Sequence, residues 1–241
     1  GDVILGIQPG GSDFTPGTIT LRLENTTGSD INELSITYKI HVYNDQNRSN
    51  SLNFSYSSDD VSYTDVASLN YSTPGAASGS PEWASTSKSA TLSSISFSNG
   101  SYFYIRWTGN DDGGSGSRDE YGINDLTIDP QIEGLWKTSA ASTDWATSSN
   151  WDNGSVPNSS TDVTIPAGAS NWPEIPGDVG TPSECNNLTI ATGATLTVPV
   201  DKCLTVNGNL SSSGTLIVSS TSSGNGSIIV SGTASGTTTV Q

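Results

Sequence analysis

Hydrophobic and polar residues alternate along the first half of the chain. Residues 31–44 show this most clearly, with five apolar or aromatic side chains at a period of two: Leu34, Ile36, Tyr38, Ile40 and Val42. Related strand-like segments follow at residues 19–25, 51–59, 90–97, 101–109 and 121–128. Successive side chains of a strand point to opposite faces, so we predict half-buried strands. Gly, Asn, Asp and Ser separate the segments, and this spacing indicates an antiparallel β-sandwich.

The last quarter of the chain carries a different repeat. Short runs of Leu, Ile, Val and Thr alternate with Gly, Asn and Ser, and one apolar residue recurs at intervals of 8, 8, 12 and 12: Leu188, Leu196, Leu204, Leu216 and Ile228. This pattern is typical of a β-solenoid, in which strands stack around an inner apolar column. A solenoid needs a capped end. Because Val240 and Gln241 offer no cap, we expect this chain to be part of a longer protein.

A tryptophan-rich segment joins the two patterns. Pro130 cannot continue a central strand, so the sandwich is predicted to span residues 1–130. Residues 134–176 are rich in Trp, Ser, Asn and Pro, and four tryptophans are expected to cover the first solenoid turn: Trp136, Trp145, Trp151 and Trp172. The predicted fold is therefore all-β, with an antiparallel sandwich followed over residues 131–241 by a short β-solenoid, or β-helix-like, domain.

The chain is strongly acidic. It has 24 Asp and Glu residues against eight Lys and Arg, a formal charge of −16. Nucleic acids and anionic membranes need a basic surface, so the charge argues against both and favours divalent cations, neutral glycans or basic partners. No stretch approaches the ~20 apolar residues of a membrane span. The chain starts at Gly1 without a signal peptide, so we expect the numbering to begin inside a longer precursor.

Two cysteines lie 18 residues apart in the repetitive region. If Leu188 and Leu204 stack on neighbouring turns, Cys185 and Cys203 have the same strand parity. A Cys185–Cys203 disulfide is therefore predicted, and it would fit an oxidising compartment. The alternative is two free, buried thiols.

Residues 109–125 concentrate oxygen ligands among glycines. Calcium takes six to eight hard oxygen ligands, and five residues are the predicted set: Asp111, Asp112, Asp119, Asn124 and Asp125. The spacing does not match an EF-hand. The alternative is a solvated acidic loop in which Arg118 forms local ion pairs.

The sequence does not predict catalysis. A glycosidase needs two carboxylates across a cleft, whereas Asp119 and Glu120 are adjacent and point to opposite faces of a strand. His41 is the only histidine and lies on the polar face of its strand, and no GxSxG motif is present. We therefore expect a chain that is not an enzyme.

A set of cations and aromatic rings is the predicted ligand surface. Six residues have the parity opposite to the apolar rows of their strands and are expected to share one outer face: Arg22, Lys39, His41, Tyr43, Tyr104 and Arg106. Cations beside rings can bind glycan hydroxyls while the rings stack on the sugar. Trp83, in a predicted loop, is the best exposed tryptophan, whereas Trp107 is expected in the core. The alternative is that the cations neutralise acids such as Glu24.

Two stretches resemble modules of known secreted proteins. The tryptophan-rich run resembles a segment common in large Bacteroidota proteins exported by the type IX secretion system: GLWKTSAASTDWATSSNWDNGSVPNSSTDVTIPAGASNWPEI, then CNNLTIATGATLTV and CLTVNGNL. Those proteins carry a C-terminal sorting domain, which is not visible here. In the first half, FYIRWTGNDDGGSGSRDEYGINDLTI looks like a lectin-like jelly roll. The resemblance implies secretion or cell-surface display, a jelly-roll sandwich, and often a structural calcium near its last strand.

The functional expectation is correspondingly broad. We predict a non-catalytic extracellular binding, adhesion or spacer region of a larger cell-surface protein, with a glycan or another surface protein as partner. One alternative is the carbohydrate-binding accessory region of a secreted polysaccharide-degrading enzyme. A second alternative is a structural subunit of an extracellular filament.

Overall fold

The protein consists of two β-rich units. The structure is a computed structural model that describes residues 3–9, 14, 16–113 and 115–240. The units are Gly1–Gln131 and Ile132–Gln241. Strands account for 52% of the chain and helices for 3%, which confirms the all-β prediction. Within the described ranges, no helix is long and apolar enough to cross a bilayer.

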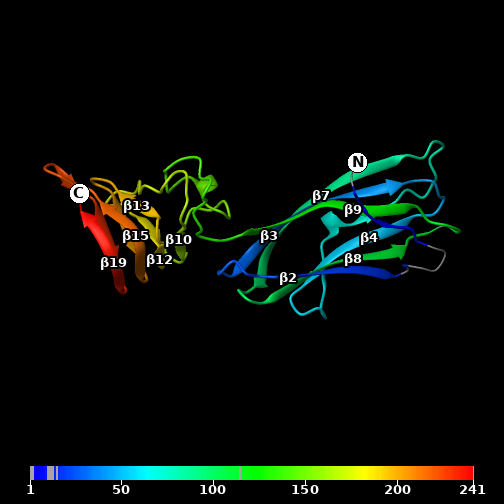
Figure 1. Ribbon diagram of the computed structural model, residues 1–241, viewed down its shortest axis with the longest axis horizontal. Helices are drawn as coiled ribbons and strands as arrows, with labels where there is room; N and C mark the ends of the chain where they lie inside the picture. The colour runs from blue at the N-terminus through cyan, green and yellow to red at the C-terminus, as the bar shows by residue number, and fades with distance from the viewer. Residues whose placement is uncertain (1–2, 10–13, 15, 114, 241) are drawn as a thin grey trace. The chain divides into compact units, whose positions relative to one another are not determined.

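The first unit is an antiparallel sandwich of two sheets (Figure 1). The sheet that we call the β3 sheet has the order β1 (Leu5–Ile7), β9 (Glu120–Gln131), β3 (Ile31–Tyr43) and β7 (Trp83–Phe97). The β8 sheet has the order β2 (Gly17–Glu24), β8 (Tyr102–Asp111), β4 (Asn50–Ser57) and β5 (Thr64–Asp65), and β6 (Tyr71–Ser72) also pairs with β4. A short 3-10 turn, η1 (Ala67–Leu69), lies between β5 and β6. This interleaved strand order is that of a jelly roll.

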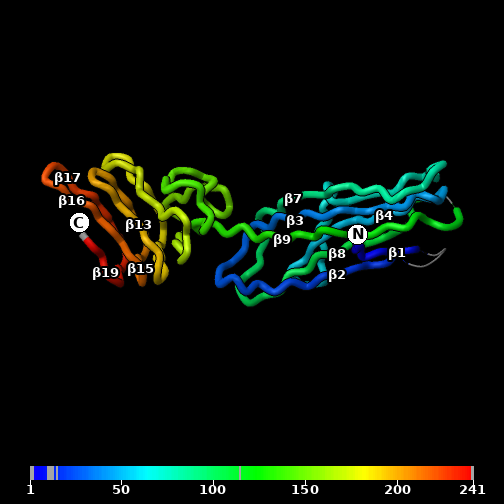
Figure 2. Tube along the Cα trace, turned by 45° about the horizontal axis from the view of Figure 1, so that its top comes forward, coloured from blue at the N-terminus to red at the C-terminus, as the bar shows by residue number. Residues whose placement is uncertain are grey.

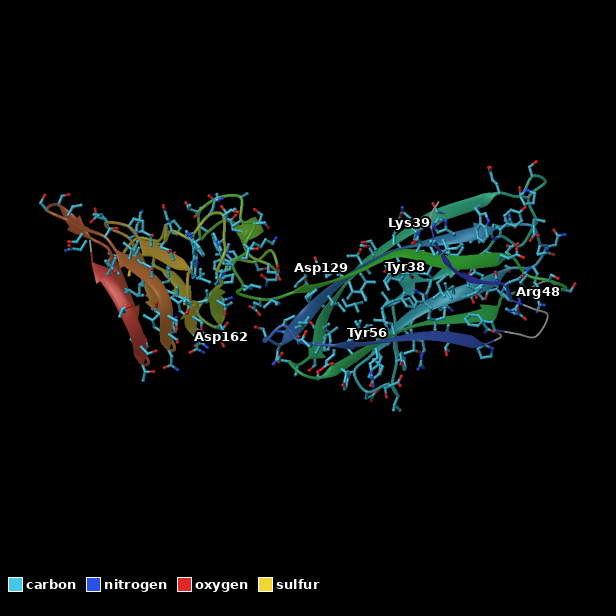
Figure 3. All side chains as sticks on the ribbon, in the orientation of Figure 1. Tyr38, Lys39, Arg48, Tyr56, Asp129 and Asp162 are labelled. Carbon is cyan, nitrogen blue, oxygen red and sulfur yellow. The ribbon has the colours of Figure 1, made fainter. Side chains whose placement is uncertain are left out.

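The inward rows of both sheets form the sandwich core. Tyr38 on β3 meets Phe54 and Trp107 of the other sheet, and the Trp107 ring lies edge-on to both at 5.5 and 5.4 Å between centroids. Figure 3 labels Tyr38 among the side chains between the sheets. Trp107 is 2% exposed, so its predicted burial is confirmed. Aromatic side chains of this size dominate core energetics.

The second unit is a β-solenoid of about four turns, as predicted (Figure 2). Its parallel strands are β10 (Val163–Ile165), β11 (Ser183–Cys185), β12 (Leu188–Ile190), β13 (Thr195–Val198), β14 (Cys203–Val206), β15 (Leu210–Val218), β18 (Ser227–Val230) and β19 (Ala234–Val240). A small antiparallel pair, β16 (Ser220–Thr221) and β17 (Gly224–Asn225), and a 3-10 turn, η2 (Ser148–Asn150), complete it.

The inner apolar column exists, but its period differs from the predicted one. Leu188, Leu196, Leu204 and Leu216 are all 0% exposed. Leu196 stacks on Leu216 and Leu204 on Ile228, whereas Leu188 stacks on Leu210. One turn contains about three short strands, so the stacking interval is 20 to 25 residues. The predicted stacking of Leu188 on Leu204 is therefore wrong.

The predicted disulfide fails for the same reason. Cys185 is in register with Val206, three residues beyond Cys203 on the paired strand β14. At ~3.3 Å per residue the two cysteine Cα atoms are offset by about 10 Å along the strands, beyond the reach of a disulfide. Both cysteines are free and buried. Burial raises the pKa of the Cys185 thiol to about 12, with smaller contributions from Asp162 and Glu184.

Three tryptophans lie in the core of the second unit. Trp136, Trp145 and Trp151 are at most 1% exposed and belong to one cluster with Val163 and Ile165 of the first strand. Their rings meet edge to face, and the Trp151 indole N–H donates to the Trp145 carbonyl at 2.8 Å. Trp172 is partly buried against the same cluster. The tryptophan-rich segment thus extends the apolar column beyond the first strand.

Candidate functional site

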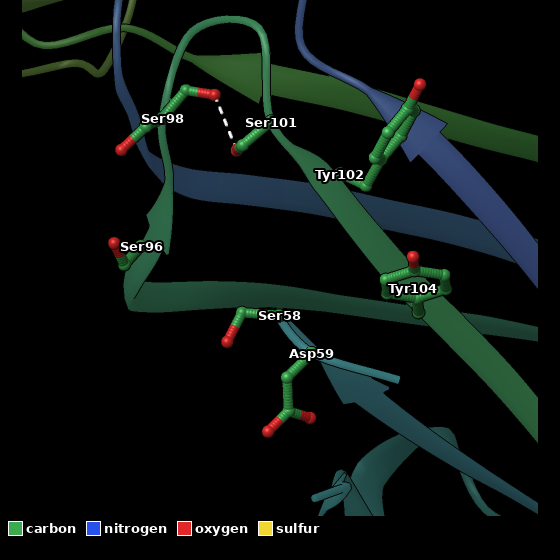
Figure 4. A pocket seen from close by; sticks show the side chains of 7 residues that line it. All are labelled: Ser58, Asp59, Ser96, Ser98, Ser101, Tyr102 and Tyr104. Atoms are coloured by element: carbon green, nitrogen blue, oxygen red, sulfur yellow. Dashed lines mark hydrogen bonds between the residues drawn. The ribbon is translucent and has the colours of Figure 1, made fainter. Parts of the chain in front are cut away.

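The β8 sheet has an open hollow where one of its strands ends early. Ser57, the last residue of β4, pairs with Tyr104, while β8 begins two residues before that, at Tyr102. Beyond Ser57 the chain turns away from β8 and leaves space beside Tyr102. The resulting tyrosine hollow has a volume of about 510 Å³ (Figure 4), and its lining residues are Ser58, Asp59, Ser96, Ser98, Ser101, Tyr102 and Tyr104.

One wall of the hollow is a set of hydroxyl and carboxylate groups. Asp59 accepts hydrogen bonds from the backbone N–H groups of Ser62 and Val61, both at 2.8 Å, and from the Ser57 hydroxyl at 2.7 Å. These hydrogen bonds hold the pKa of Asp59 below its usual value, and the bond from Ser62 has the largest effect. The carboxylate therefore stays ionised and can accept hydrogen bonds. Four serines present hydroxyls beside it, and one of them, Ser101, donates to the Ser98 carbonyl at 2.6 Å.

The opposite wall carries the Tyr102 ring, which Arg22 holds, and a second ring–arginine pair lies outside the lining of the hollow. The Arg22 guanidinium lies 4.6 Å from the ring centre of Tyr102, which remains 42% exposed. Arg106 lies 3.7 Å from the ring centre of Tyr63 and pairs with Asp60 at 3.0 Å. Cation–π contacts of this kind fix rings in place at partly exposed sites. The outer face of the β8 sheet therefore presents rings that need little further ordering to stack on a ligand.

This arrangement can bind a hydroxylated ring. A sugar ring has an apolar C–H face that can pack on tyrosine and a rim of hydroxyls that both donate and accept. Asp59 is the one carboxylate among the described residues that line the hollow. Glycoside hydrolysis ordinarily uses two carboxylates.

The predicted single ligand surface is split in two. Arg22, Tyr104 and Arg106 lie on β2 and β8 of the β8 sheet, whereas β3 of the other sheet carries Lys39, His41 and Tyr43. Strand parity correctly places these side chains outward, but a sandwich has two outer faces and parity does not distinguish them. The expectation of one shared face is therefore wrong.

Trp83 belongs to the β3 sheet rather than to a loop. It opens strand β7, is 50% exposed, and packs on Tyr43 with 5.6 Å between ring centres.

Sequence reasoning missed two aromatic rings on the outer side of the β8 sheet, those of Tyr102 and Tyr63. Tyr102 has the same parity as Tyr104 and Arg106 in the run SYFYIRW, so the signal was available in the alternation. Tyr63 lies in the loop after β4, where no periodicity identifies it, and only the folded chain brings it to Arg106.

The predicted calcium ligands are held by other partners. Asp111, at the end of β8, pairs with Arg48 and, at 2.7 Å, with Arg118. Asp112 accepts from the Ser72 hydroxyl at 2.8 Å. Asp125, at a β-bulge of β9 with a φ of +52°, pairs at 2.8 Å with Lys39 of the neighbouring strand β3.

The remaining two ligands do not complete a metal site. Asp119 is buried, and burial raises its pKa; its Oδ1 accepts the Gln46 N–H at 2.9 Å. Asn124 accepts the N–H of Asp125 at 2.7 Å. Among the described residues, no group of three or more His, Cys, Asp or Glu side chains could hold a metal ion. The five residues fit ion pairs and loop anchoring, and they do not fit a calcium site.

A sequence family covers the second unit. Residues 135–240, the tryptophan-rich segment and the solenoid, match the family model of a domain of unknown function, DUF8693. No curated protein matches the chain.

Three solved structures show distant likeness. The carbohydrate-binding module TmCBM61, in complex with β-1,4-galactotriose, is 13% identical with a TM-score of 0.33, over 53% of this chain and 70% of that one. A structure of infectious bursal disease virus, Gx strain, is 12% identical with a TM-score of 0.29, over 53% and 30%. A family 16 carbohydrate-binding module is 10% identical with a TM-score of 0.25, over 51% and 73%. At these TM-scores none of the three bears on the site or its ligand.

Proposed function

We propose that this chain is a non-catalytic extracellular binding region whose sandwich binds a neutral glycan in the tyrosine hollow. The observation that carries the proposal is the pairing of an exposed, arginine-held Tyr102 ring with a row of serine hydroxyls across an open hollow. A glycan would stack one ring on Tyr102 and exchange hydrogen bonds with the serines and Asp59.

Charge favours a neutral ligand over an anionic one. The chain has a formal charge of −16, and the ionised Asp59 lines the hollow. Arg106 is engaged by Asp60 and Tyr63, so its charge is partly compensated. An acidic glycan would therefore meet the like charge of Asp59, against which Arg22, stacked on Tyr102, supplies one cation.

The solenoid suits the role of a spacer in such a protein. Stacked strands lie ~4.8 Å apart, so about four turns extend the chain by roughly 20 Å without a flexible linker. Display outside the cell rests on the resemblance of residues 134–175 to segments of secreted proteins.

Glycan-array screening followed by titration calorimetry tests the proposal. For any glycan bound by the wild type, Tyr102→Ala is expected to weaken binding roughly 5- to 150-fold, if stacking on this ring contributes the ~1–3 kcal/mol found for bases on aromatic side chains. Tyr102→Phe keeps the ring and is expected to retain most of the affinity. Unchanged melting temperatures would show that both variants fold. If the array shows no neutral glycan bound, or if Tyr102→Ala binds as well as the wild type, the hollow is not the site.

A further inference from the structure

The outer face of the β3 sheet holds a second hollow, on the side of the sandwich opposite to the tyrosine hollow. Two cross-strand rows of outward-facing residues define it. One row consists of Gln8, Glu120, Tyr43 and Trp83. The row beside it contains two glycines and consists of Gly6, Gly122, His41 and Ser85. Two glycines next to a row of large side chains leave a depression in the sheet surface.

The glycines keep this depression open. A Cβ built on Gly6 would meet no atom of the described residues within 4 Å. A Cβ on Gly122 would lie 2.7 Å from the Leu5 carbonyl oxygen, so the close approach of β1 requires glycine there. The resulting Trp83 pocket has a volume of about 220 Å³, and its lining residues are Ile4, Gly6, Ile7, Gln8, Trp83 and Glu120. It is smaller than the ~300–1,000 Å³ of pockets for drug-sized ligands.

Two polar atoms on this face are buried without a partner. Glu120 Oε1 accepts from the Gln8 side-chain amide at 2.6 Å, but Glu120 Oε2 has no hydrogen-bond partner among the described residues. His41 Nε2, in the neighbouring row, is also buried and without a partner there. Buried polar groups are nearly always hydrogen-bonded, and Glu120 lines the pocket, so its free Oε2 indicates that a ligand group completes it there.

The chemistry of the pocket selects a neutral hydroxylated ring. Trp83 offers a half-exposed indole that Tyr43 holds from behind. Glu120 Oε2 accepts a hydrogen bond from a hydroxyl and disfavours an anionic ligand. The nearby Lys39 forms an ion pair with Asp125, which compensates its charge.

We infer that the Trp83 pocket binds a single neutral sugar ring, either a monosaccharide or the terminal ring of a glycan. The apolar face of the ring packs on the indole, and one hydroxyl donates to Glu120 Oε2. The choice of ligand class rests on the proposed function, but the site is separate from the tyrosine hollow.

Saturation-transfer NMR of the full chain with the methyl glycosides of glucose, galactose and mannose tests this site. The wild type and Tyr102→Ala are expected to transfer saturation to the ring C–H protons of at least one glycoside. Trp83→Ala and the isosteric Glu120→Gln are expected to reduce the transfer and to weaken binding at least 10-fold. Ser87→Ala, an outward-facing change farther along the same strand, is the matched control and is expected to bind like the wild type.

The four variants separate the two proposals. If no glycoside binds the wild type, or if Trp83→Ala and Glu120→Gln both bind like Ser87→Ala, the pocket holds only water and the inference is wrong. If Tyr102→Ala alone loses glycan binding, the tyrosine hollow stands and the Trp83 pocket does not. If the Trp83 and Glu120 variants alone lose binding, the Trp83 pocket stands and the site assigned to the proposed function is wrong. Melting temperatures establish that each variant folds.

Discussion

A ladder of side chains runs up one corner of the solenoid. Each member immediately precedes a strand of the stacked β10–β12–β15–β19 sheet, and its oxygen accepts the backbone N–H of the next member: Asp162, Asn187, Asn209 and Thr233. The three backbone bonds measure 3.1, 2.8 and 2.9 Å. Figure 3 labels Asp162, the first member. Such stacked amides tie each turn to the next, as asparagine ladders do in other parallel β-stacks.

Replacing the second member is expected to loosen the stack. Asn187→Ala removes the bond from Asn187 Nδ2 to Asp162 Oδ1 at 2.8 Å and leaves the Asn209 N–H without its acceptor. At ~0.5–1.5 kcal/mol for each bond, the free energy of unfolding should fall by about 1–3 kcal/mol. For a unit of this size that corresponds to a melting temperature lower by roughly 4–12 °C. Asn187→Asp keeps an acceptor for the Asn209 N–H but places a second carboxylate beside Asp162. The decrease in its free energy of unfolding should therefore become smaller as salt is added.

Calorimetric melting and amide hydrogen exchange measure these effects. Exchange at the Asn209 amide should accelerate in Asn187→Ala, because that amide loses its acceptor. Thr189→Ala, an exposed change on the adjacent strand, is the control and should stay within about 0.5 kcal/mol of the wild type. The reasoning is wrong if Asn187→Ala melts at the same temperature as Thr189→Ala and the Asn209 amide keeps its normal protection from exchange. Water would then replace the ladder hydrogen bonds at no net cost.

Two further outcomes concern residues whose predicted roles the structure changes. Alkylation of the unfolded, unreduced chain should modify both Cys185 and Cys203, as judged by intact mass, because their strand register prevents a disulfide; a mass that shows neither thiol modified would contradict that register. Asp111→Ala should lower the free energy of unfolding by up to about 3 kcal/mol, in calcium and in chelator alike, because it leaves the buried Arg118 without one ion-pair partner. A loss seen only in calcium would instead identify Asp111 as a metal ligand.

Strand periodicity predicted the fold because it is a local property. The alternation around Tyr38 and Ile40 directly reports a strand with one buried face, and both side chains are at most 2% exposed. The recurring leucines likewise predicted an apolar column. Stacking register is different, because it depends on how many strands fill one turn. Leu204 is closer to Leu188 in sequence than Leu210 is, but Leu210 is the residue that pairs with Leu188 on the neighbouring strand.

The candidate sites were only partly predictable for a related reason. Parity places Arg22 and His41 outward, but which sheet each belongs to follows from long-range pairing that local alternation does not encode. The depression beside Trp83 depends on Gly6 pairing with Gly122, 116 residues later. In the sequence alone each is one of 26 glycines.

The two proposed sites lie on opposite outer faces of the same sandwich, and this geometry limits how they can act together. Trp83 opens β7, and Ser96, near the other end of that strand, lines the tyrosine hollow, so the two sites are roughly 40 Å apart along the strand and a short, stiff glycan does not reach both. Simultaneous occupancy therefore joins two glycans or two distant parts of one, and it increases avidity only where the ligands are dense or flexible enough to meet both faces. Dense glycan is what a polymer matrix or a coated surface presents. If both sites bind as proposed, their separation would suit adhesion to a dense glycan better than the capture of a lone soluble oligosaccharide.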